Sequence, residues 1–185
     1  VADQLGLGAE RGDDEAVGWL RDALGLPASF DGLLTDTAST STLIALGAAR
    51  EALGVSASAD GLPGRAEVAQ LRVYASAHAH SSIDKACMTL GSGRASVVHV
   101  AVDDAYAMRP DALEAAIAAD RAAGHRPMAI VATVGTTSST AVDPVAAIAN
   151  IAEREGLWLH VDSAYAGVVA LKVHPEWLKS QQLPP

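Results

Sequence analysis

Short apolar segments rich in β-branched residues alternate along most of this chain with amphipathic segments of about a dozen residues. Strands that alternate with helices in this way predict βαβ units and a mostly parallel sheet. We therefore expect a three-layer α/β domain. The predicted strands are 71–76, 96–102, 128–134 and 157–162, and the predicted helices are 13–25, 39–54, 80–91, 109–124 and 143–156.

Residues at the ends of these helical segments predict where the helices begin and end. Ser39 is a good N-cap for the segment that follows it, and Asp143 with Pro144 predicts an N-cap and a first helical residue. Glycine favours the left-handed conformation in which many helices stop. The predicted stops are Gly25, Gly91 and Gly124.

Charge and cysteine content limit the function. The 185 residues carry a formal net charge of −9, which argues against a surface for nucleic acid or anionic membranes. The single cysteine, Cys87, cannot form an internal disulfide, and no apolar run of 18 residues or signal-peptide pattern is present. We expect a soluble, cytoplasmic protein.

Unusual residues follow three of the predicted strands, in SAHAHSS (76–82), GTTSST (135–140) and DSAYAG (162–167). Ligands of parallel α/β sheets bind beyond the carboxyl ends of the strands. Asp162 ends an apolar strand, and an unpaired buried charge is costly, so this carboxylate should face solvent or a cation. These three segments predict a ligand site at one edge of the sheet.

The kind of ligand follows from the groups that these segments contain. TASTST at 37–42 opens a helix, where backbone N–H groups and hydroxyls favour an anion such as phosphate. His80 offers an imidazole to cover a flat group, and Asp162 offers a carboxylate to a cationic ring nitrogen. A phosphate, a flat ring and a ring cation together describe pyridoxal 5′-phosphate.

A metal site is the alternative that the histidines raise. His78 and His80 lie two residues apart, as do His160 and Asp162, so the four could in principle share a zinc ion. The chain has neither an HExxH nor a CxxC pattern, and we expect no metal. A metal-dependent hydrolase is accordingly the third choice of function.

Four ordered segments resemble the pyridoxal-phosphate-dependent group II decarboxylases, most of all their aromatic-L-amino-acid branch. HVDSAYAG resembles the family's HVDAAYAG, and VATVGTTSSTAVDPVAAIANIAEREGLWLHVD resembles its ATxGTT…WLHVD block. AHSSIDKA resembles its histidine helix, and FDGLLTDTASTSTLIALGAAR its phosphate-binding segment. The likeness runs from about Asp13 to Ala170 and implies the large domain of a fold-type I pyridoxal-phosphate enzyme.

The resemblance implies a role for six residues. Asp162 would pair with the pyridine nitrogen and keep it protonated, and His80 would stack on the ring, which makes both catalytic. Ala38 and Ser39 would bind the phosphate, Thr137 would lie near the cofactor, and Ala164 would pack against the ring. His78 matches nothing fixed in the family, and Ser163 replaces the usual alanine after the aspartate.

One family feature is not found. The lysine that holds the cofactor as a Schiff base belongs to an HKW-type motif downstream of the aspartate, and no such motif follows Asp162 here. Lys85, Lys172 and Lys179 lack its context. We expect residues 1–185 to be a partial cofactor-binding large domain, without the N-terminal segment, the lysine segment and the C-terminal small domain, and inactive alone. The full-length protein would be a homodimer.

The expected reaction is decarboxylation of an L-amino acid to CO₂ and an amine, with an aromatic substrate favoured by Tyr165 and the HSS run. Two alternatives remain open. The chain could belong to another fold-type I pyridoxal-phosphate enzyme, an aminotransferase or a desulfurase. It could also be a truncated, non-catalytic module that serves as a scaffold or dimerisation partner.

Overall fold

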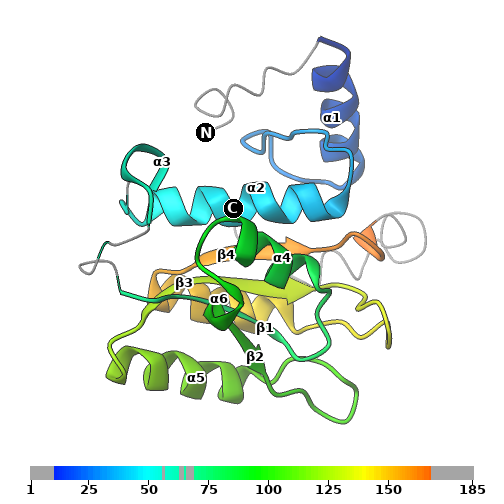
Figure 1. Ribbon diagram of the computed structural model, residues 1–185. Helices are drawn as coiled ribbons and strands as arrows, with labels where there is room; N and C mark the ends of the chain where they lie inside the picture. The colour runs from blue at the N-terminus through cyan, green and yellow to red at the C-terminus, as the bar shows by residue number, and fades with distance from the viewer. Residues whose placement is uncertain (1–10, 56, 63–64, 66–68, 168–185) are drawn as a thin grey trace.

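The computed structural model describes residues 11–55, 57–62, 65 and 69–167, which form helices on both sides of a sheet (Figure 1). None of the helices among these residues is long and apolar enough to cross a bilayer. The helices are α1 (Arg11–Ala23), α2 (Ala38–Ala52), α3 (Ala57–Asp60), α4 (Ser82–Thr89), α5 (Pro110–Ala122) and α6 (Val145–Glu155). The strands are β1 (Leu71–Ser76), β2 (Val97–Val100), β3 (Arg126–Thr133) and β4 (Trp158–Asp162).

The four strands form one sheet in the order β2-β1-β3-β4, and every neighbouring pair is parallel. Each strand is joined to the next by a segment that contains a helix or a helical turn, because parallel neighbours need a crossover connection. The predicted strands are confirmed to within two residues at each end. The parallel sheet also confirms the predicted α/β class.

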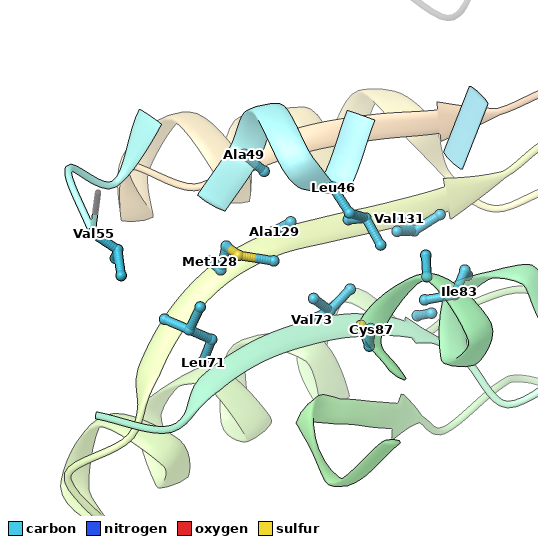
Figure 2. Close-up of a cluster of buried hydrophobic side chains, with 12 residues drawn as sticks. Leu46, Ala49, Val55, Leu71, Val73, Ile83, Cys87, Met128, Ala129 and Val131 are labelled. Atoms are coloured by element: carbon cyan, nitrogen blue, oxygen red, sulfur yellow. The ribbon is translucent and has the colours of Figure 1, made fainter. Parts of the chain in front are cut away.

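One face of the sheet is covered by α2 and α4. Leu46 and Ala49 of α2 and Ile83 of α4 pack on alternate residues of the strands, among them Val73 and Val131 (Figure 2). These positions alternate because successive side chains of a strand point to opposite faces. This cluster is the first half of the core.

The opposite face is covered by α5 and α6. Leu113 of α5 and Ile148 of α6 pack against the intervening strand residues, such as Tyr74, Ile130 and Ala132. Both faces of the central strands are therefore buried, which explains why every residue of MAIVATV (128–134) except Thr133 is apolar. Helices, sheet and helices form the three predicted layers.

Two of the predicted helix starts are wrong, although the predicted stops are confirmed by the positive φ of all three glycines. Ser39 lies inside α2, and the N-cap is Thr37, whose extended backbone lets its Oγ1 accept the N–H of Thr40 at 3.2 Å. Asp143 does not cap α6, which begins at Val145. Its carboxylate turns to other backbone N–H groups, described below.

Candidate active site

The predicted site segments lie at one edge of the sheet. All four strands are parallel, so β1, β3 and β4 end at the same edge. Helix α2 runs opposite to the strands, and its N-terminal end lies on the side to which the arrowheads of β3 and β4 point (Figure 1). The carboxyl ends of the strands and the amino end of α2 therefore meet.

Asp162 is the last residue of β4, and its side chain is half-buried. Leu159 and Val161 pack in the core beneath α5 and α6, so the alternation of the strand turns His160 and Asp162 to the face that α2 covers. The carboxylate Oδ1 accepts the N–H of Ala164 at 3.2 Å. Among the described residues Asp162 forms no ion pair, which leaves a partly desolvated carboxylate available to a cation.

His160, two residues earlier on the same face, is also half-buried. Burial lowers the pKa of its imidazole, because desolvation disfavours the charged ring, and the nearby Asp162 carboxylate opposes that shift. His160 therefore tends to be neutral and leaves the negative charge of Asp162 uncompensated.

His80 lies on the loop between β1 and α4, and its ring is exposed. Its Nδ1 accepts the N–H of Ser82, the first residue of α4, at 3.2 Å. In the neutral ring the proton then lies on Nε2, because Nδ1 acts as the acceptor. This hydrogen bond thus sets the tautomer of the neutral ring and holds its Nδ1 edge against the start of α4.

The first residues of α2, Ala38 and Ser39, are exposed at the same edge of the sheet. Thr37 uses its Oγ1 and its carbonyl for Thr40 and Ser41. No hydrogen bond from the backbone N–H of Ala38 or Ser39 is found in the described part of the chain. These two N–H groups, at the positive end of a helix of 15 residues, suit an anion.

Thr137 and Ala164 are exposed on the two loops that follow β3 and β4. The loops lie against each other at Gly135, where an added Cβ would come within 2.8 Å of Cδ1 of Tyr165 and 3.0 Å of Cβ of Ala166. Its φ of 89° also favours glycine. Gly135 thus lets the segment that carries Ala164 approach the end of β3.

Asp143 is a buried carboxylate of this edge and not the N-cap that the sequence predicts. Its side chain is 0% exposed, and its two oxygens accept the N–H groups of Met108 and Thr133, each at 2.7 Å. Burial raises the pKa of Asp143, and the two backbone N–H groups oppose that rise. An Asp-Pro dipeptide before a helix resembles a cap locally, and the two N–H groups that the fold brings to it, those of Met108 and Thr133, distinguish the two roles.

His78 and Lys85 are the other candidate residues of the sequence that the structure describes. His78 contacts Tyr106 edge to face with ring centroids 5.1 Å apart. No group of three or more His, Cys, Asp or Glu side chains could hold a metal ion within the described ranges, so the four residues of the metal alternative do not gather. Lys85 is exposed on α4, and Lys172 and Lys179 lie outside the described residues.

This is a three-layer α/β domain in which a carboxylate, an imidazole and a helix N-terminus lie at one sheet edge, and these groups suit a phosphorylated aromatic ligand. The conserved domain of pyridoxal-dependent decarboxylases matches residues 13–182. The chain belongs to this family, and the family's cofactor is pyridoxal phosphate. The group II decarboxylase resemblance of the sequence is thereby confirmed.

Individual relatives support the same assignment. The chain is 41% identical to rat histidine decarboxylase, covering 83% of this chain and 25% of the relative. It is 40% identical to bovine aromatic-L-amino-acid decarboxylase, over 80% of this chain and 32% of that protein. It matches the crystal structure of Oryza sativa TDC with PLP and tryptamine at a TM-score of 0.78 and 38% identity, over 90% of this chain and 35% of that one. The chain spans about a quarter to a third of these relatives.

The residues of this edge are chemically suited to pyridoxal phosphate. Asp162 offers a carboxylate without an ion-pair partner among the described residues, and α2 offers two N–H groups to a phosphate. Next to Asp162, the hydroxyl of Thr133 is buried and has no hydrogen-bond partner within the described part. The two N–H groups suit the phosphate of the cofactor, and the carboxylate suits its cationic ring nitrogen.

Proposed function

We propose that the full-length protein decarboxylates an L-amino acid with pyridoxal phosphate as cofactor. The observation that carries this proposal is the half-buried carboxylate of Asp162 at the end of β4, on the face and at the edge where α2 begins. The names of the relatives, histidine decarboxylase and aromatic-L-amino-acid decarboxylase, support the reaction class.

When bound, pyridoxal phosphate supplies an electron-withdrawing ring that accepts the electron pair of the broken Cα–carboxylate bond. Asp162 holds the proton on the pyridine nitrogen, because a nearby negative charge favours the protonated form. The N–H groups of Ala38 and Ser39 bind the phosphate. The imidazole of His80 would stack on the ring and restrict water, and the small side chain of Ala164 would pack against the ring. The products are CO₂ and an amine that carries a proton in place of the carboxylate.

An aromatic amino acid is the substrate that we propose. Tyr165 lies on the loop after β4, beside Ala164, and is 63% exposed. Its ring offers a flat apolar surface to an aromatic side chain. We further propose a cytoplasmic homodimer. The family resemblance supports the dimer, and the single buried Cys87 agrees with a reducing compartment.

Replacement of Asp162 in the full-length protein tests the reaction. We expect Asp162→Ala to lower kcat by about 100-fold or more while the fold is retained, because each unit of pKa lost by the ring nitrogen corresponds to about 1.4 kcal/mol. CO₂ release is measured with histidine, tyrosine, tryptophan, aspartate and glutamate, and the aromatic substrates should react fastest.

The exposed Asp60, on α3, provides the control, because Asp60→Asn removes a carboxylate at the opposite edge of the sheet, where α2 ends (Figure 1). Rates of Asp162→Ala within a few-fold of wild type would exclude the role of Asp162. A clear preference for an acidic amino acid would contradict the aromatic substrate but not the reaction.

A further inference from the structure

The hydroxyl of Thr133 is an unusual group in this core. Thr133 ends β3 and is 3% exposed, and its Oγ1 has no hydrogen-bond partner among the described residues. Buried polar groups in native proteins are nearly always paired, because an unpaired one loses its hydrogen bonds to water without replacement. Packing alone therefore does not explain a threonine at this position.

The backbone of Thr133 is held on both sides by one residue. Its N–H donates to Oδ2 of Asp143 at 2.7 Å, and its carbonyl accepts the N–H of Asp143 at 2.9 Å. The other oxygen of Asp143 accepts the N–H of Met108, so the anchoring carboxylate is itself fixed. The orientation of Thr133 is thus set by the fold, and only its hydroxyl remains to be paired.

The direction of the hydroxyl follows from the strand. Ala129 and Val131 pack beneath α2, so Thr133, two residues further on, faces the same side. Its register partner on β4 is Asp162, which faces that side as well. Neighbouring strands lie about 4.8 Å apart, which brings a threonine hydroxyl within reach of a paired carboxylate. Ala164 donates to Oδ1 of Asp162, and no donor to Oδ2 is found among the described residues.

We propose that Thr133 is a positioning residue for Asp162. When the cofactor is bound, its hydroxyl donates a hydrogen bond to the Asp162 oxygen that Ala164 does not hold, and this bond orients the carboxylate toward the cationic ring nitrogen of the cofactor. The inference rests on the proposed function, because it assigns Asp162 the ring nitrogen as its partner. It also accounts for a polar residue at a buried position where valine would fill the same space.

Two substitutions in the full-length protein separate the hydroxyl from the shape of the side chain. Thr133→Val removes the hydroxyl, and Thr133→Ser retains it. The affinity for pyridoxal phosphate is measured by fluorescence titration, and the melting temperature is measured without cofactor. We expect Thr133→Val to weaken binding about tenfold or more, and Thr133→Ser about threefold at most, since a hydrogen bond to a charged group is lost only in the first.

The melting temperature of the cofactor-free protein should not fall in Thr133→Val, although the affinity for the cofactor does. Without cofactor, Thr133→Val should melt at the wild-type temperature or higher, because it removes a buried group that lacks a partner. Ser96→Ala is the matched control, since Ser96 is 0% exposed, lies at the amino end of β2 and donates to the Ser92 carbonyl at 2.8 Å. That variant should melt lower and bind the cofactor as wild type does.

A double-mutant cycle shows whether the hydroxyl acts through Asp162. In the background of Asp162→Asn, Thr133→Val should change the affinity less than twofold, because the interaction is already lost. Wild-type affinity in Thr133→Val, or equal weakening by Thr133→Val in both backgrounds, would overturn the inference. Wild-type protein that binds the cofactor but releases no CO₂ would overturn the proposed function alone. Wild-type protein that does not bind pyridoxal phosphate would overturn both.

Discussion

At the scale of single residues, two aspartates each accept two backbone N–H groups, one of them in the core and the other at the surface. Asp143 accepts two backbone N–H groups with two different oxygens and is fully buried. Asp103, on the loop before α5, accepts the N–H groups of Ala105 and Ala107 with the single oxygen Oδ1 and is exposed. An amide has one oxygen acceptor, so it can replace the second aspartate but not the first.

We therefore expect Asp143→Asn to lower the free energy of unfolding by about 1–3 kcal/mol, since either Met108 or Thr133 is left with an unpaired buried N–H. Asp103→Asn should change it by less than about 0.5 kcal/mol. Urea denaturation of both variants measures the difference. Equal effects would show that the two oxygens of Asp143 are not both needed.

At the scale of secondary structure, the start of α2 combines a structural cap with the proposed phosphate site. The cap is Thr37, while Ser39 lies inside the first turn. Ser39 is suited to an N-cap by its chemistry, but the extended backbone that a cap requires occurs at Thr37, with φ −148° and ψ 156°. Stability and cofactor binding are therefore assigned to different residues of one turn.

This division predicts opposite results for two alanine substitutions. Thr37→Ala should lower the free energy of unfolding of the cofactor-free protein by about 1 kcal/mol, because the Thr40 N–H loses its acceptor. Ser39→Ala should leave that stability within about 0.5 kcal/mol of wild type. Thermal denaturation of the two variants decides between the caps, and a larger loss from Ser39→Ala would restore Ser39 as the cap.

At the scale of the whole molecule, one sheet separates two clusters of buried side chains. Leu46 of α2 belongs to the cluster on one face, and Leu113 of α5 belongs to that on the other; both are 0% exposed. The central strands β1 and β3 contribute side chains to both clusters. The two halves of the core therefore share a backbone and should unfold together.

Leu46→Ala and Leu113→Ala should each lower the free energy of unfolding by about 2–5 kcal/mol, because each leaves a cavity in a packed core. Far-ultraviolet circular dichroism and tryptophan fluorescence should report the same midpoint for each variant. Separate transitions by the two probes would show instead that one layer unfolds without the other.

The sequence by itself determined the features that depend on near neighbours. The four strands, the glycine helix stops and the parallel direction of the strands follow from hydrophobic periodicity and from backbone preferences that act within a few residues. The same reasoning placed chemically distinctive residues at the end of a strand, as for Asp162, or just after one, as for His80, so the edge that carries them was predictable from the rules of parallel sheets.

Only the tertiary structure decided which partners the polar groups have. Asp143 resembles a helix cap locally, but the N–H of Met108, 35 residues earlier in the chain, competes for its carboxylate in the folded core. Thr133 resembles any strand residue until the register places it opposite Asp162. A hydrogen bond depends on which groups the fold brings together and on what it shields from water, and neither is encoded within a short stretch of sequence.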